Sequence, residues 1–224
     1  KGGNLNWKRR WDFGNGVLGD MGSLLIDLPY WALELSRPNK VKADGPKGDK
    51  VAAPPSQIAT WHHPDANVGG GKRGEVDLIW YHGPEGMKTM VERLQPKLGK
   101  DTNISKWHIG VAFVGDEGII VSDYGKIVHS PREKFKDYKR PNPSIAKSLG
   151  HHKEWISACK GEGKSLCNFE YSGALIEHNL LGNLAHRVEV GKEFEWDAEK
   201  FEITNDKKAN ELLSKTYRKG WEVS

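Results

Sequence analysis

A glycine-rich segment leads into a predicted helix and contains one carboxylate, Asp20, whose surroundings suit a ligand site. Gly14, Gly16, Gly19 and Gly22 lie around it, and residues that lack a Cβ let the backbone approach a ligand closely. A carboxylate in such a place can orient a substrate hydroxyl and exchange a proton with it. An aspartate at a helix start is also a common N-cap, whose side chain accepts hydrogen bonds from backbone amides. The local pattern by itself favours the cap.

The loop that precedes this helix is rich in aromatic and charged residues. It contains Trp7, Arg9, Arg10, Trp11 and Asp12. Aromatic faces, guanidinium donors and a carboxylate acceptor form the set expected around a polyol or a carboxylate ligand. A surface loop with one buried tryptophan explains the same residues, and the pattern does not decide between the two. The chain's nine tryptophans suit the C–H faces of sugars, although core packing is their commoner use.

The histidines and cysteines predict no metal site. His62 and His63 fall in a predicted strand, where successive side chains point to opposite faces. His151 and His152 begin a predicted helix, where neighbours diverge by about 100°. The two cysteines, at positions 159 and 167, have no zinc-type spacing. A metal bound by distant histidines remains an alternative without a supporting motif.

Residues 69–74 match the GxGxxG pattern of dinucleotide-binding loops letter for letter. That motif binds a pyrophosphate only when it follows a strand and begins a helix within a βαβ unit. Here it precedes a predicted strand, so we interpret it as a flexible loop between two strands.

Hydrophobic periodicity predicts an α+β fold with an open, largely antiparallel β-sheet and helices packed on one face. A helix is expected over residues 21–35, with Pro29 kinking it or ending its first part. Six consecutive strands without long intervening helices follow at residues 41–43, 57–63, 76–82, 110–114, 118–122 and 126–129. Helices are then expected at residues 150–160, 172–187 and 207–217, with strands at 194–196 and 201–204. We expect residues 1–224 to form a single α+β domain.

Charge and composition exclude several classes of protein. The formal charge of +4 comes from basic residues interleaved with acidic ones, so we expect no nucleic-acid surface. No apolar run approaches the ~18 residues of a membrane span, and the composition is typical of a soluble globular protein. The chain begins at Lys1 without a leader pattern, which indicates a processed or truncated start and leaves the compartment open between a bacterial cytoplasm and periplasm.

Several segments together resemble the C-terminal domain of Gfo/Idh/MocA oxidoreductases. They are NWKRRWDFGNGVLGDMGS at residues 6–23, IDLPYWAL at 26–33, GDEG at 115–118, GHHKEWISACKG at 150–161, NFEY at 168–171, WD at 196–197 and ITN at 203–205. The resemblance spans essentially the whole chain. The glycine-rich segment and the HHKEW helix are specific together and weak singly.

The resemblance implies an enzyme that moves hydride between NAD or NADP and a sugar or polyol carbon. Some members of the family use a transient oxidation to cleave glycosides. The cofactor would be held by an N-terminal Rossmann domain that this chain lacks, so the chain alone is expected to bind no cofactor. The open sheet would make contacts in a homo-oligomer.

The family motif Asp-x-Gly-x-His is only partly present. Asp20 and Gly22 are kept, but Leu24 stands where the histidine is expected, and leucine cannot exchange a proton. Either another histidine, such as His151 or His152, takes this role, or the chain has lost the redox chemistry.

The resulting prediction is a sugar-binding domain with Asp20 and His151 as catalytic residues. Substrate-binding roles are predicted for Arg10, Trp11, Asp12, His152 and Tyr81. The alternatives are a non-catalytic carbohydrate-binding or oligomerisation module and a metal-dependent hydrolase.

Overall fold

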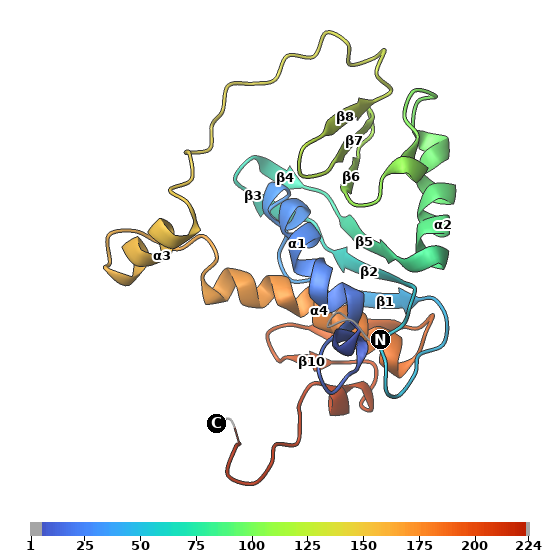
Figure 1. The fold of residues 1–224 in the computed structure, drawn as a ribbon, viewed down its shortest axis with the longest axis vertical. Coiled ribbons are helices and arrows are strands. Elements are labelled where there is room, and N and C mark those ends of the chain that lie inside the picture. The colour runs from blue at the N-terminus through green and yellow to red at the C-terminus, as the bar shows by residue number, and fades with distance from the viewer. Residues whose placement is uncertain (1–5, 223–224) are drawn as a thin grey trace.

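A five-stranded antiparallel sheet forms the centre of the computed structural model, which describes residues 6–222 (Figure 1). The strand order is β10-β9-β1-β2-β5. The strands are β1 (Lys40–Asp44), β2 (Gln57–His63), β5 (Val76–His82), β9 (Glu193–Asp197) and β10 (Glu202–Ile203). Each of them was predicted from the sequence to within one or two residues.

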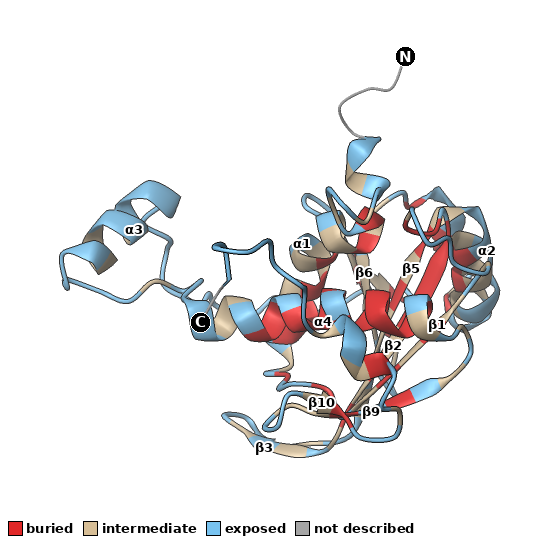
Figure 2. Ribbon diagram, turned by 90° about the horizontal axis from the view of Figure 1, so that it is seen from below, coloured by how far each residue is buried: buried red, intermediate tan, exposed pale blue. Residues whose placement is uncertain are grey.

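Two long helices, α1 (Gly16–Ala32) and α4 (Phe169–Val188), pack on each other and cover one face of this sheet (Figures 1 and 2). Alternate strand residues such as Val41, Trp61 and Phe194 point into the core between them. At Gly182 of α4 a Cβ would lie 2.7 Å from Trp61 and 2.8 Å from Leu18. The glycine therefore sets the close approach of α4 to α1 and to the sheet.

The expected break at Pro29 is not found, because α1 continues as one helix to Ala32. Pro29 has no N–H to bond to the carbonyl of Leu25, and its ring crowds that carbonyl, so it carries a local cost that the helix tolerates. Pro29 lies in the last turn and is itself buried in the core.

A second hydrophobic core lies beyond β5, and the elements that form it contradict two predictions made from the sequence. Helix α2 (Gly83–Leu94) follows β5 directly and separates the five-stranded sheet from a three-stranded one. That sheet consists of β6 (Val111–Val114), β7 (Ile119–Ser122) and β8 (Ile127–Ser130). The consecutive strands therefore do have a helix between them, and they belong to more than one sheet.

Helix α2 was not predicted, because Gly83, Pro84 and Gly86 are residue types that are typical of loops and turns. Pro84 instead occupies the first turn, where its fixed φ suits a helix and its missing N–H costs nothing. Tyr81 follows the core residue Trp80 in β5 and so points to the opposite face of the sheet, where it packs against the second core beside α2. Helices therefore contact both faces of the larger sheet at its β5 edge, and the prediction that all of them pack on one face was wrong.

The glycine motif belongs to a small β-hairpin. Strands β3 (Ala66–Val68) and β4 (Gly71–Arg73) pair with each other, and the turn between them contains Gly69 and Gly70. No helix follows it, which agrees with rejecting a dinucleotide loop, although the segment is a hairpin rather than a flexible loop.

The expected C-terminal helix at residues 207–217 is reduced to a short 3-10 turn, η4 (Ala209–Leu212). Asn210 explains the difference. Its side chain bonds both backbone groups of Ile203 in β10, accepting from the nitrogen at 2.7 Å and donating to the oxygen at 2.9 Å. This asparagine ties the tail to the sheet edge. Three further 3-10 turns are η1 (Trp7–Arg9), η2 (Gln95–Lys97) and η3 (Ile104–Lys106).

An extended arm, residues 139–167, leaves the body after β8 and carries helix α3 (His151–Cys159) (Figures 1 and 2). None of the residues of α3 is buried. The arm returns to the body at the start of α4. Within residues 6–222, no helix combines the length and apolar character needed to cross a membrane.

Candidate functional site

A groove of about 410 Å³ follows the outer side of α4. Its volume lies in the ~300–1,000 Å³ range of small-molecule sites. One wall comes from residues before α1, the floor from α4, and the other wall from β9, the β9–β10 turn and the tail. The lining residues are Trp11, Asn15, Gly173, Ile176, Glu177, Leu180, Leu181, Asn183, Leu184, Arg187, Trp196, Phe201, Leu212 and Leu213.

Trp11 is the predicted substrate-binding residue that lies in this groove. Its indole N–H donates to the backbone oxygen of Asp49 at 3.1 Å, and its backbone nitrogen donates to Val51. The guanidinium of Arg187 lies 4.7 Å from the centre of its ring. The loop before α1 thus holds a flat aromatic face against the last turn of α4.

Buried hydrogen bonds fix the floor and the far wall of the groove. Glu177 accepts from Trp196 Nε1 at 2.6 Å and from Arg37 Nε at 3.0 Å, so both carboxylate oxygens are occupied. Asn183 donates to the backbone oxygen of Asn15 at 2.8 Å and ties α4 to the start of α1. The groove therefore combines apolar and aromatic surface with a few fixed polar groups, which is the usual make-up of a small-molecule site.

Asp20 lies on the exposed side of α1, one turn inside the helix rather than at its cap. The helix begins at Gly16, with Asn15 in the N-cap position. The carboxylate of Asp20 forms an ion pair with Lys8 of the preceding loop. Asp20 is therefore not the helix cap that the local pattern favoured. It does not line the groove.

The residues that follow Asp20 on the same side of α1 are apolar and uncovered. Leu24, Leu28 and Trp31 repeat at helical spacing and are all exposed, Leu24 by 56%. Leu24, which stands where the resemblance leads one to expect a histidine, thus points to the same side as Asp20. No histidine takes its place in this stripe.

The other predicted site residues do not converge on Asp20. Arg10 and Asp12 are exposed on the loop beside Trp11, and the backbone of Arg10 pairs with Ala52. His151 and His152 are exposed at the start of α3, which stands apart from α1 in both views (Figures 1 and 2). Tyr81 belongs to the second core, where its hydroxyl accepts from Arg93 at 3.3 Å.

A pair of buried histidines lies in the main core beneath the groove's floor. The rings of His63 and His178 stack with centres 5.1 Å apart, and their Nε2 atoms are 3.3 Å apart. His178 Nδ1 is 2.9 Å from the carbonyl oxygen of Ala174, so Nδ1 donates and Nε2 accepts from His63. Burial lowers the pKa of His63 to about 3 and that of His178 to about 4. Both rings are therefore neutral near pH 7 and serve as packed polar core residues.

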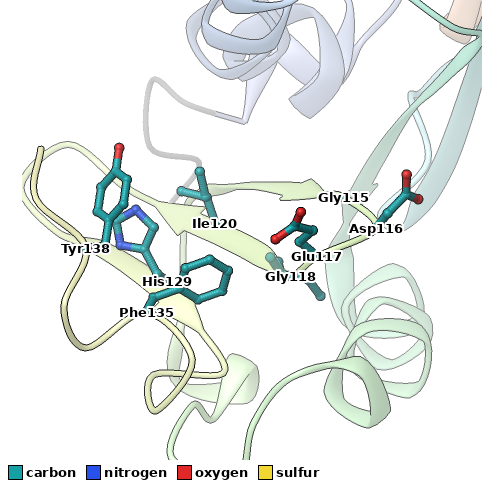
Figure 3. Close-up of a pocket in the computed structure, with 9 residues that line it drawn as sticks. Gly115, Asp116, Glu117, Gly118, Ile120, His129, Phe135 and Tyr138 are labelled. Atoms are coloured by element: carbon teal, nitrogen blue, oxygen red, sulfur yellow. The ribbon is translucent and has the colours of Figure 1, made fainter. Parts of the chain in front are cut away.

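The second hollow, of about 360 Å³, lies on the three-stranded sheet (Figure 3). Figure 3 shows His129, Phe135 and Tyr138 at one end and the carboxylates of Asp116 and Glu117 at the other. Lys134 bonds the backbone oxygen of Glu117 at 2.8 Å and pairs with its carboxylate at 3.2 Å. This hollow shares no residue with the predicted site.

Sequence reasoning missed most of the groove. The outward residues of α4 repeat at helical spacing, which predicts the helix but does not separate its core side from its exposed side. Arg187 meets Trp11 only through the tertiary fold. Among residues 6–222, no three His, Cys, Asp or Glu side chains gather as a metal site would require.

No family model matches the chain, and no curated protein matches it.

Proposed function

We propose that this chain is the substrate-binding domain of an NAD(P)-dependent sugar or polyol oxidoreductase, or of a related redox-assisted glycoside-processing enzyme. The single observation that carries the sugar-binding part is Trp11, fixed at the wall of a groove with the size and mixed surface of a monosaccharide site. The redox part rests on the sequence resemblance and on the α+β architecture with an open antiparallel sheet.

In this proposal the groove binds the sugar by stacking and by a few directed hydrogen bonds. The face of the Trp11 ring that Arg187 does not cover would contact the C–H groups of the sugar. The guanidinium of Arg187 faces the hydroxyl edge. Cofactor chemistry would be supplied by a nucleotide-binding domain, and NAD or NADP would bind there.

The proposed catalytic role of Asp20 would require a substrate position separate from the groove, because Asp20 does not line it. Its side chain is exposed at the start of α1, and release from Lys8 would free its carboxylate. The exposed stripe that contains Leu24 would then face the nucleotide-binding domain. His151 would reach this surface only if the arm changed its position.

Calorimetry against a panel of neutral and acidic monosaccharides tests the sugar-binding part. We expect binding that Trp11→Ala abolishes and that Asp20→Asn leaves nearly unchanged, because Asp20 lies outside the groove. Trp7→Ala is the matched control, since Trp7 belongs to the same loop but does not line the groove. Binding that is equally strong in Trp11→Ala, or no binding to any sugar, would contradict the proposal.

A second candidate is an oligomerisation module, and the arm is the observation that favours it. Exposed apolar side chains gather along the arm and at its junction with α4; they are Ile145, Leu149, Trp155, Ile156, Leu166 and Phe169. Apolar surface of this kind on an unpacked helix is typical of an interface. The predicted interface was instead the open face of the larger sheet. That face carries cross-strand polar contacts such as the Lys40–Glu193 ion pair and the His62–Asp77 hydrogen bond.

A further inference from the structure

We infer that the groove over α4 selects saccharides that carry a carboxylate, such as uronic acids, and that Arg187 is the residue that recognises the acid group. The inference deepens the proposed function and rests on it. It names the class of sugar rather than a different activity.

The charge of the groove is the first argument. Its lining contains two ionisable groups, Glu177 and Arg187. The carboxylate of Glu177 is already paired with Arg37 and bonded to Trp196. Among residues 6–222 no carboxylate forms an ion pair with Arg187, so the groove presents one uncompensated positive charge.

The geometry of Arg187 is the second argument. Its guanidinium lies over the ring of Trp11, which is held in turn by Asp49 and Val51. A ring face contacts the flat side of a guanidinium and leaves its N–H groups free. These donors form a planar fork that matches the two oxygens of a carboxylate.

The position of the fork suits a uronic acid. Such a sugar has an apolar C–H face that can lie on aromatic and aliphatic surface, and a carboxylate at the edge of its ring. Leu180 and Phe201 supply apolar surface within the groove, and Arg187 lies at the C-terminal end of the α4 residues that form its floor. One ligand can therefore contact both parts together.

Two structural roles would also explain in part why an arginine stands at position 187. It lies in the last turn of α4, where a cation is favoured by the helix dipole, and it stacks on an aromatic ring. Neither role uses the N–H donors. Arg218 is a matched case because its guanidinium lies 4.9 Å from the ring centre of Trp221, and it lines neither hollow.

The test compares D-glucuronate and D-galacturonate with D-glucose and D-galactose by calorimetry at low salt. We expect the acids to bind at least about tenfold more tightly than the matching neutral sugars, the effect of one charge-assisted hydrogen bond. Arg187→Gln should remove this preference, with a smaller loss of affinity for the neutral sugars, whose hydroxyl edge Arg187 also faces. Arg187→Lys should keep part of it, because lysine retains the charge without the fork. Arg218→Gln should behave as the wild type does.

The outcomes separate this inference from the proposed function. Equal affinity for acids and neutral sugars, with binding still dependent on Trp11, would overturn the acid selectivity and leave the sugar-binding function in place. The same holds if the preference survives in Arg187→Gln. No binding of any of the four sugars would overturn both. Circular dichroism of each variant checks that the exposed substitution has left the fold intact.

Discussion

The carboxylate of Asp20 forms an ion pair with the ammonium group of Lys8, and this pair joins the loop before α1 to the exposed side of the helix. The side chain of Asp20 is 41% exposed and that of Lys8 is 26% exposed. A pair that solvent reaches from both partners contributes little to stability. The loop is held mainly by its backbone bonds to residues 51–53.

Asp20→Asn should therefore lower the free energy of unfolding by less than about 1 kcal/mol. Urea denaturation followed by tryptophan fluorescence measures this quantity. Such a small effect would make Asp20→Asn a clean variant for functional assays. A loss of several kcal/mol would instead show that Asp20 has a structural role that the exposed ion pair does not explain.

Two glycines of α4 should respond in opposite directions to the same substitution. Gly182→Ala places a methyl group 2.7 Å from Trp61 and 2.8 Å from Leu18, so we expect a loss of about 1–3 kcal/mol through overpacking. At Gly173 an added Cβ meets nothing within 4 Å, so Gly173→Ala should stabilise the helix by up to about 1 kcal/mol. Thermal unfolding of the two variants tests the pair, and the same sign for both would contradict the packing of α4 on the sheet.

Acid should destabilise the fold through His63 and His178. Both have a native pKa below the usual 6.5, at about 3 for His63 and about 4 for His178. Between these native pKa values and pH 6.5, the unfolded chain therefore binds more protons than the native one. Above pH 6.5 both states are neutral at these residues and stability is unaffected. As the pH falls below 6.5, each histidine should lower the free energy of unfolding by up to about 1.4 kcal/mol per pH unit.

Denaturant titrations between pH 7.5 and 4.5 measure this slope, and His178→Phe provides the comparison. The variant removes one proton-binding group from the core, so its stability should fall less steeply with acid than that of the wild type. Equal slopes in the two proteins would show that other groups dominate the acid response.

The arm should drive self-association through its exposed aromatic residue. Trp155 is 66% exposed on α3, and Trp221 in the tail is 67% exposed. We expect light scattering on a sizing column to report an oligomer for the wild type and for Trp221→Ser. The double variant Trp155→Ser/Ile156→Ser should shift towards the monomer, because it removes the apolar contacts of α3. An oligomer that is insensitive to the double variant would place the interface elsewhere, such as the open face of the sheet.

Local patterns predicted the strands well and the site only in part. β2 and β5 were predicted with their exact bounds, since each is a β-branched and aromatic run that turn residues delimit. Helix α2 was missed because its glycines and proline suit a helix start as well as a loop. For the site, Trp11 was predicted from its loop, whereas Arg187 depends on how α4 packs beside that loop. His151 was linked to Asp20 by resemblance, but the arm carries it away from α1.

The most direct test of the sugar-binding account observes the indole N–H resonances of the chain by ¹H–¹⁵N NMR during titration with D-glucuronate. The resonance of Trp11, identified by its loss in Trp11→Ala, should shift saturably, and that of Trp196 across the groove should move with it. Trp155 and Trp221, which lie outside the groove, should stay in place. A titration that leaves the Trp11 resonance unmoved, or that shifts all four alike, would contradict a carbohydrate site over α4.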